Sequence, residues 1–260
     1  MPQALGAFTL DETRALMSWL SRQGPFWEDV RIHDSDQYLF RDEEIVTDTA
    51  VGEAAYCKLN GLDKRLVSFT PSDWEGSPIA VEWVPEDGTA KQINIENYVE
   101  ANGFEQVLEM AADPINSWRR LEEMAIPRFS NLHFADYAFD SLEGYPFAEG
   151  AAQRILILLN TLNRLKVCFD EHGNRTAEGH EIYQDQFTGD KARFSDSSDT
   201  EKRVYQDTLT FSHPEKDGEF LFCPMHGKEK SNQLRVHFSS PITLAEPLYI
   251  VYIGPKLTKH

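Results

Sequence analysis

The chain has 260 residues, of which 41% are hydrophobic and 12% aromatic, so it is long enough to bury one large core or two small ones. Its formal net charge of −18 at pH 7 repels polyanions and disfavours nonspecific adhesion to DNA or anionic lipid. No apolar run approaches the length of a membrane-spanning helix, and the opening residues lack the features of a signal peptide, so we expect a cytoplasmic location. The odd number of well-separated cysteines also favours a reducing compartment over a disulfide framework.

The first hundred residues mix helix and strand signals. Thr9 and Glu12 form a capping-box pattern ahead of an amphipathic helix, and a second short helix is predicted over 49–60, stopping at Gly61. Alternating and β-branched residues then predict strands over 65–69, 78–84 and 90–96. The sequence "PEDG" between the last two predicts a turn, which makes them a hairpin.

Helix signals dominate from residue 95 to residue 168. Helices are predicted over 98–113 and from Pro114 onward, because proline suits the first turn of a helix. The stretch "GAAQRILILLNTLNRLKVCF", residues 150–169, has apolar residues around most of the helical cylinder. This pattern predicts a helix at the centre of the core or at a subunit contact.

A polar, glycine-containing stretch follows over 170–200, and it predicts a long surface connection. Ser198 with Glu201 predicts the start of a further short helix. Four strands with short turns between them then favour an antiparallel meander, over 208–212, 219–226, 233–239 and 247–253.

The predicted fold class is therefore α+β, with an N-terminal mixed α/β part, central helices and a C-terminal antiparallel β-meander. The predicted organisation is a mixed helix and strand domain over 1–169, a surface connection over 170–200 and an antiparallel sheet over 201–260. The pattern leaves open whether the sheet shares one core with the first part.

Positive charge gathers near the C-terminus. Residues 224–260 contain five basic and two acidic side chains, a net charge of +3, which leaves −21 on the rest of the chain. Lys256, Lys259 and His260 follow the last predicted strand and could extend this positive patch or form a flexible tail. The acidic excess elsewhere has a simple interpretation as a solvated surface that keeps the protein soluble.

The sequence "MHGKEKSNQLRVHF", residues 225–238, predicts a hairpin that concentrates this charge. If Ser231 and Asn232 occupy the turn, His226 pairs with His237 and Lys228 pairs with Arg235. Side chains alternate along a strand, so all four lie on one face, which we expect to meet solvent. Residues 234, 236 and 238 then point toward a core.

This quartet suggests three interpretations. As catalytic residues, His226 and His237 could act as general base and general acid while Lys228 and Arg235 stabilise a phosphoryl oxygen, as in metal-independent phosphodiester cleavage. As a binding site, the quartet could hold an anion, because two like charges directly opposite each other are otherwise destabilising. The third interpretation is a merely solvated sheet face.

Other chemistries find less support. Cys168, His172, Cys223 and His226 have locally acceptable spacing for zinc, but a zinc-bound His226 could not serve as a base. Neither a phosphate-binding glycine loop nor a dinucleotide fingerprint is present, and the acidic residues around the strand over 78–84 lack the lysine of a metal-dependent nuclease. We therefore predict neither a cofactor nor a metal.

Two functional hypotheses remain from different classes. The first is a phosphate-handling or anion-handling protein, with a metal-independent phosphodiesterase or ribonuclease as its enzymatic form and a phosphate-containing ligand or RNA as its partner. The second is a non-enzymatic, acidic protein–protein interaction module with a basic C-terminal docking face. Membrane association is not expected.

Overall fold

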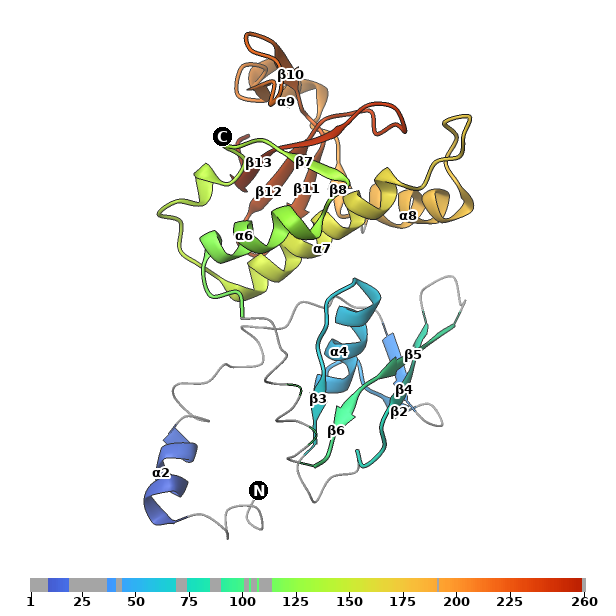
Figure 1. Ribbon diagram of the computed structural model, residues 1–260, viewed down its shortest axis with the longest axis vertical. Coiled ribbons are helices and arrows are strands. Elements are labelled where there is room, and N and C mark those ends of the chain that lie inside the picture. Colours follow the sequence, from blue (N-terminus) through green and yellow to red (C-terminus); the bar gives the residue numbers. More distant parts are fainter. Residues whose placement is uncertain are drawn as a thin grey trace. The chain divides into compact units, whose positions relative to one another are not determined.

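The computed structural model describes residues 9–18, 37–40, 44–68, 74–84, 90–100, 103, 107, 114–190 and 192–258. Contacts divide the chain into two units, Met1–Pro114 and Ile115–His260 (Figure 1). The boundary expected near residue 169 falls inside the second unit, because the long apolar helix before it packs on the C-terminal sheet. The helix predicted over 98–113 lies almost wholly outside the described residues.

The first unit contains a four-stranded antiparallel sheet with the strand order β2-β1-β4-β5. Its strands are β1 (Gln37–Phe40), β2 (Glu44–Ile45), β4 (Ile79–Val84) and β5 (Lys91–Ile95). Helix α4 (Ala50–Leu59) packs against β4 and β5. The remaining described elements are α2 (Leu10–Ser18) and the parallel pair of β3 (Leu66–Val67) with β6 (Asn97–Tyr98).

Local sequence explains α4 and the β4–β5 hairpin. The helix begins where the Thr49 hydroxyl accepts a hydrogen bond from the Gly52 N–H, and it stops before Gly61, whose φ of 76° favours glycine. Along β4, Ile79 and Val81 are buried while Ala80 and Glu82 are exposed. The helix predicted over 49–60 and the two paired strands are thus confirmed, whereas the "PEDG" turn lies outside the described residues.

The second unit is built on a five-stranded sheet with the strand order β7-β13-β12-β11-β8. Its strands are β7 (Leu132–Phe134), β13 (Leu248–Pro255), β12 (Leu234–Phe238), β11 (His226–Glu229) and β8 (Phe194–Ser195). Neighbours are antiparallel except β7, which runs parallel to β13. The α+β fold class with a C-terminal antiparallel meander, here β11-β12-β13, is confirmed.

The first part of the predicted meander folds differently. Strands β9 (Thr210–Ser212) and β10 (Phe220–Phe222) form a separate two-stranded sheet. The single strand predicted over 219–226 is divided between β10 and β11, and Pro224, which has no N–H to donate to a ladder, lies in the break.

Helix α7 (Glu149–Lys166) provides the core of this unit. Ile155, Leu158, Leu159 and Leu162 are at most 2% exposed, which confirms the predicted central helix. The sheet approaches α7 closely at Gly227, where an added Cβ would lie 2.9 Å from the Phe194 ring and 3.1 Å from the Leu158 side chain. The shorter helices are α6 (Trp118–Arg128), η2 (Asp140–Leu142), α8 (Ala177–Phe187) and α9 (Asp199–Val204).

The segment over 170–200, expected to be a surface connection, contains both α8 and β8. Thr176 caps α8, and aromatic side chains add to the buried aliphatic side chain of Ile182. Phe187 stacks on Phe194 with ring centroids 4.5 Å apart, and Phe194 is fully buried. Among the helices that the structure describes, none combines the length and apolar character needed to cross a membrane.

Candidate functional site

The predicted pairing of the C-terminal hairpin is confirmed. His226 lies opposite His237 and Lys228 lies opposite Arg235, with the two imidazole centroids 5.1 Å apart. The alternate residues of β12 point to the other side of the sheet and are fully buried: Leu234, Val236 and Phe238. The four candidate residues therefore share one face of β11 and β12.

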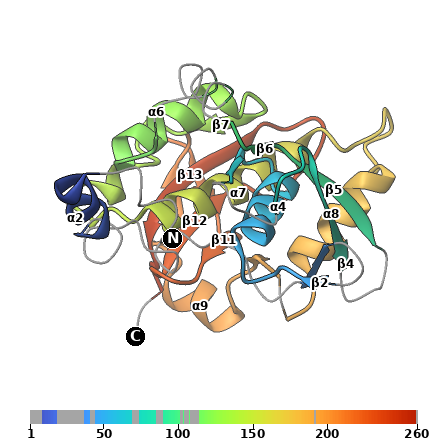
Figure 2. The ribbon, with the colours of Figure 1, turned by 90° about the horizontal axis from the view of Figure 1, so that it is seen from below.

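The expectation that this face meets solvent is wrong. His237 is 2% exposed, His226 and Arg235 are each 8% exposed, and Lys228 is half-buried. Residues 196–222 return over the face, and the Phe211 ring of β9 lies 5.9 Å from the His237 ring. In both ribbon views β11 and β12 lie between α7 and α9 (Figure 1 and Figure 2).

Backbone carbonyls fix the tautomer of both imidazoles. His237 Nδ1 lies 2.9 Å from the Cys223 carbonyl oxygen, and His226 Nδ1 lies 3.1 Å from the Pro224 carbonyl oxygen. Because a carbonyl can only accept, each Nδ1 carries the hydrogen and each neutral ring has its lone pair on Nε2. His226 Nε2 lies 3.4 Å from the Ser195 hydroxyl of β8, which can donate to it.

Burial keeps both imidazoles neutral near pH 7. Desolvation, reinforced by the neighbouring His226 and Arg235, lowers the pKa of His237 to about 3. Desolvation also lowers the pKa of His226, with the positive charges of Arg235 and Lys228 acting in the same direction. A general base and general acid pair needs one protonated ring, so this geometry supports binding better than proton transfer, and the catalytic assignment stays a prediction.

Arg235 is a buried cation that the protein itself satisfies only in part. Its Nη1 donates to the Leu234 and Glu229 carbonyl oxygens, at 2.8 and 3.3 Å. Its Nε is buried without a hydrogen-bond partner in the part of the chain that the structure describes, and no described carboxylate forms an ion pair with it. Desolvation lowers its pKa, although a guanidinium stays protonated at any physiological pH.

Positive charge exceeds negative charge around Arg235. Burial and the nearby Lys230 and Arg235 lower the pKa of Lys228. The nearest acid on this side is Glu201 of α9, which pairs with Lys256 at 3.5 Å and accepts hydrogen bonds from Thr258 and Ser198. We call the set of Ser195, His226, Lys228, Arg235 and Lys256 the cationic face.

The hydrogen bonds from Thr258 and Ser198 lower the pKa of Glu201 to about 2, so this carboxylate is ionised at neutral pH. It therefore balances one of the three cations of the cationic face, and its closest cation is Lys256 rather than Arg235. Of the residues predicted to extend the patch, Lys256 lies here, whereas Lys259 and His260 fall outside the described residues.

Glu229, the acid at the end of β11, lies toward the opposite side of the sheet. Its carboxylate is fully buried, accepts hydrogen bonds from the Ser231 and Asn232 N–H groups, and lies 3.5 Å from Arg154 of α7. It closes the turn, and its charge also favours the protonated form of Arg235, although the two side chains form no ion pair. Sequence reasoning used Glu201 only as a helix-capping residue and assigned neither Ser195 nor Glu229 to the site. Of those two, only Glu229 gave a signal, through its position just before the turn residues.

The zinc alternative gains no support. Cys168 is buried beside Leu165 and Ile182, whereas the His172 side chain is 75% exposed. Cys223 is buried with Tyr249 and Val251, and desolvation raises the pKa of its thiol to about 12. Within the described residues, no group of three or more His, Cys, Asp or Glu side chains is placed to hold a metal ion.

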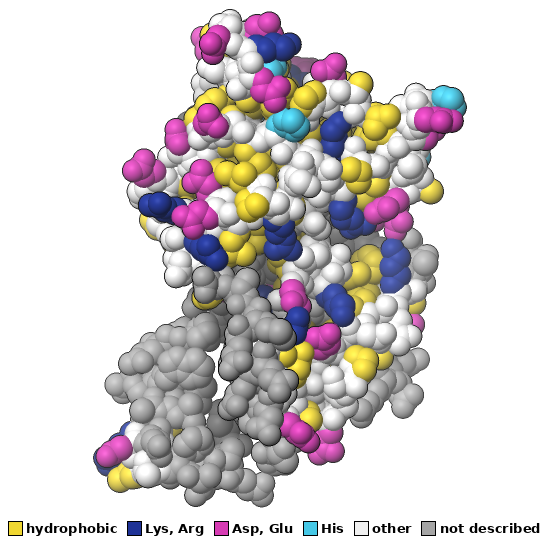
Figure 3. All heavy atoms as spheres, viewed as in Figure 1, with side chains coloured by type: hydrophobic (Ala, Val, Ile, Leu, Met, Phe, Trp, Pro, Cys, Tyr) yellow, Lys and Arg dark blue, Asp and Glu magenta, His cyan; other side chains and the backbone are white. Residues whose placement is uncertain are grey.

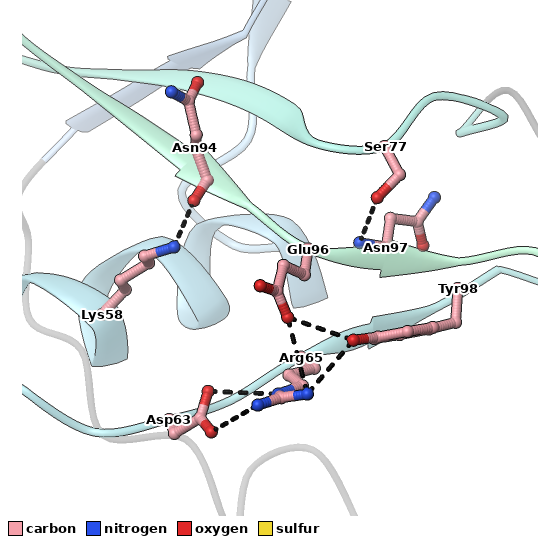
Figure 4. A network of polar contacts seen from close by, with 8 residues as sticks. All are labelled: Lys58, Asp63, Arg65, Ser77, Asn94, Glu96, Asn97 and Tyr98. Carbon is pink, nitrogen blue, oxygen red and sulfur yellow. Dashed lines mark hydrogen bonds and ion pairs between the residues drawn. The ribbon is translucent and has the colours of Figure 1, made fainter. Parts of the chain in front are cut away.

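A second candidate lies in the first unit, where a hollow of about 230 Å³ is lined by residues 58, 61–65 and 96. Figure 4 shows its polar network, in which Arg65 contacts both oxygens of Asp63 and the Glu96 carboxylate at 3.5 Å. Lys58 donates to the Asn94 carbonyl oxygen at 2.6 Å, and Lys64 pairs with Glu53 at 3.4 Å. Each cation there has a partner, unlike the Nε of Arg235.

The chain matched no family model, no curated protein and no solved structure in comparisons with known proteins. The geometry of the cationic face is therefore the basis for a functional proposal.

Proposed function

We propose that the protein binds a small oxyanion of the phosphate type on the cationic face of its C-terminal sheet. The observation that carries this proposal is the burial of Arg235 without a contacting carboxylate. A buried charge without a partner is costly, and an oxyanion would supply both the opposite charge and hydrogen-bond acceptors. Lys228 lies directly opposite and could contact the same ligand.

The balance of charge favours a small anion over a long nucleic acid. With a net charge of −18, the whole protein repels a polyanion, while a single phosphate group feels mainly the local cations. On the face that Figure 3 displays, the described acidic and basic side chains are interspersed rather than gathered by sign. A phosphate group of a nucleotide or of a short RNA end presents the same chemistry as the free ion.

Phosphodiester cleavage is the second candidate, because the imidazoles of His226 and His237 lie next to the proposed anion site. RNA and small phosphodiester turnover in the presence of EDTA tests it, comparing the wild type with His226→Ala and His237→Ala. Activity that is lost in both variants, with circular dichroism unchanged, would favour an enzyme. Absence of turnover in the wild type would argue against the ribonuclease.

A protein-docking role for this face has less support. Arg235 is too deeply buried for the surface of another protein to reach, which leaves the more exposed Lys228, Lys230 and Lys256 as contacts. Pull-down of one specific protein that is lost on substitution of these lysines would favour docking.

A cytoplasmic location also stays a proposal, and the three buried free cysteines are consistent with it.

Isothermal titration calorimetry with phosphate and sulfate tests the binding proposal. We expect one site per chain and an affinity that falls at least tenfold in Arg235→Gln and in Lys228→Gln. Lys216→Gln is the matched control, because it removes the same charge from a side chain that is 60% exposed, in the turn between β9 and β10. An affinity that is equal in all four proteins, or no binding at millimolar concentration, would contradict the proposal.

A further inference from the structure

We infer that an anion enters the cationic face together with a proton, which binds Nε2 of His226 and turns that imidazole into a second charged contact. The inference rests on the proposed function, and it specifies how the same site recognises its ligand. The ligand class is a fully ionised oxyanion, held between the Arg235 guanidinium and an imidazolium that forms on binding.

The geometry assigns the proton to one atom. His226 Nδ1 already donates to the Pro224 carbonyl oxygen, so only Nε2 can take up a proton. The proton comes from buffer or water, an N–H bond forms on Nε2, and no group is oxidised or reduced. Ser195 lies 3.4 Å from this nitrogen, and once Nε2 is protonated the hydroxyl hydrogen is free to turn toward the anion.

His226 is better placed than His237 for this role. It is 8% exposed against 2%, and it borders Ser195 on β8 as well as the cations of the cationic face. His237 lies deeper, with Phe211 beside its ring. The imidazole nearer to solvent can accept a proton with less loss of hydration.

Burial first, and then the positive charges that face it, explain why His226 is neutral before the anion arrives. Arg235 and His237 face it from β12, Lys228 lies on its own strand, and Glu201 acts on it from α9. The two cations oppose a further positive charge, and the carboxylate of Glu201 is shared with Lys256. An anion beside Arg235 reverses the local field, so the protonated form of His226 becomes the favoured one.

A direct consequence is that anion affinity depends on pH even when the charge of the anion does not. Sulfate is the appropriate probe, because it stays doubly charged throughout the neutral range, whereas phosphate itself titrates. Linkage between the anion and the proton makes the affinity for sulfate fall by up to about tenfold for each unit of rising pH. This slope applies between the pKa values of His226 in the free and in the bound protein.

Calorimetry of sulfate binding at pH 7 measures the proton uptake directly. The titration is repeated in Bis-Tris and in Tris, two cationic buffers that differ in ionisation enthalpy and do not compete for an anion site. We expect uptake of more than half a proton per sulfate in the wild type. His226→Asn keeps an amide donor near the Pro224 carbonyl and lacks Nε2, so we expect weaker binding without proton uptake.

Nitrogen NMR of the wild type gives a readout that does not depend on the variant. In protein labelled with ¹⁵N-histidine, the Nε2 resonance of His226 should move from the position of a bare lone pair to that of an N–H when sulfate is added. Sulfate binding with equal heats in both buffers and an unmoved resonance would overturn the inference and leave the proposed function intact. No sulfate binding at any pH would overturn both.

Discussion

The two faces of the five-stranded sheet are both covered, but by different chemistry. On the α7 side of β12, Leu234, Val236 and Phe238 are fully buried against apolar neighbours. On the other side of the same strand, Arg235 and His237 are at least 92% buried. Strand alternation therefore separates the two faces without revealing whether the polar one meets solvent.

The covers differ as much as the faces. Helix α7 presents a continuous apolar surface. The polar face lies beneath short elements, whose apolar contacts include Phe211 and Leu221 against Cys223. Polar contacts add to these, including the Tyr249 hydroxyl, which donates to Glu215 at 2.8 Å. The α7 side should thus contribute most of the stability, and the polar side is where the chain retains groups that stability alone does not require.

The largest expected effect tests the α7 side. Phe194 is fully buried, stacks on Phe187 at 4.5 Å and meets the edge of Phe238 at 5.8 Å. We expect Phe194→Ala to lower the free energy of unfolding by about 3–5 kcal/mol, through lost burial and the cavity that remains. Urea unfolding measures this loss of free energy. Phe220→Ala, on a 66% exposed ring, is the control and should change stability by no more than about 0.5 kcal/mol.

The second prediction concerns pH and the polar side. Because the pKa of His237 is about 3 in the folded protein and about 6.5 in an unfolded chain, the unfolded state binds more protons between these values. The contribution of His237 to the free energy of unfolding is therefore fully present above pH 6.5. It is lost as the pH falls toward 3, by about 1.4 kcal/mol per pH unit. His226, whose pKa is also lowered, acts in the same direction.

Urea unfolding of the wild type and of His237→Asn, between pH 7.5 and 4.5 in sulfate-free buffer, isolates this contribution. Asparagine retains a donor for the Cys223 carbonyl but does not titrate, and contributions of the carboxylates cancel between the two proteins. The control is His172→Asn, on a 75% exposed side chain. If His237→Asn showed the same acid destabilisation as the wild type, the imidazole would be accessible to protons and the contrast between the two faces would fail.

Sequence reasoning succeeded where the signal was local. The apolar run of α7, the capping box of Ser198 with Glu201, and the pairing of His226 with His237 each follow from one short stretch of sequence. The polar cover depends instead on distant contacts, such as Phe211 with His237 and Glu201 with Thr258, 57 positions away. A two-residue strand such as β8 is also too short for any alternation to appear.

The smallest expected effect gives the sharpest comparison, because it uses adjacent residues on opposite faces of β12. Arg235→Met removes a buried charge whose Nε has no described partner, at the cost of two hydrogen bonds to carbonyls. Replacing a buried charge with an apolar side chain of similar length is often neutral or stabilising. We therefore expect the free energy of unfolding in anion-free buffer to change by no more than about 1 kcal/mol.

The matched variant is Val236→Ala, which removes less volume from the apolar face and yet should destabilise by about 1–3 kcal/mol. We expect sulfate to raise the melting temperatures of the wild type and of Val236→Ala, and to leave that of Arg235→Met unchanged. If Arg235→Met lowered the free energy of unfolding more than Val236→Ala did, and if sulfate raised the melting temperatures of both variants equally, Arg235 would be a structural residue. The polar face would then contribute stability in the same way as the apolar one.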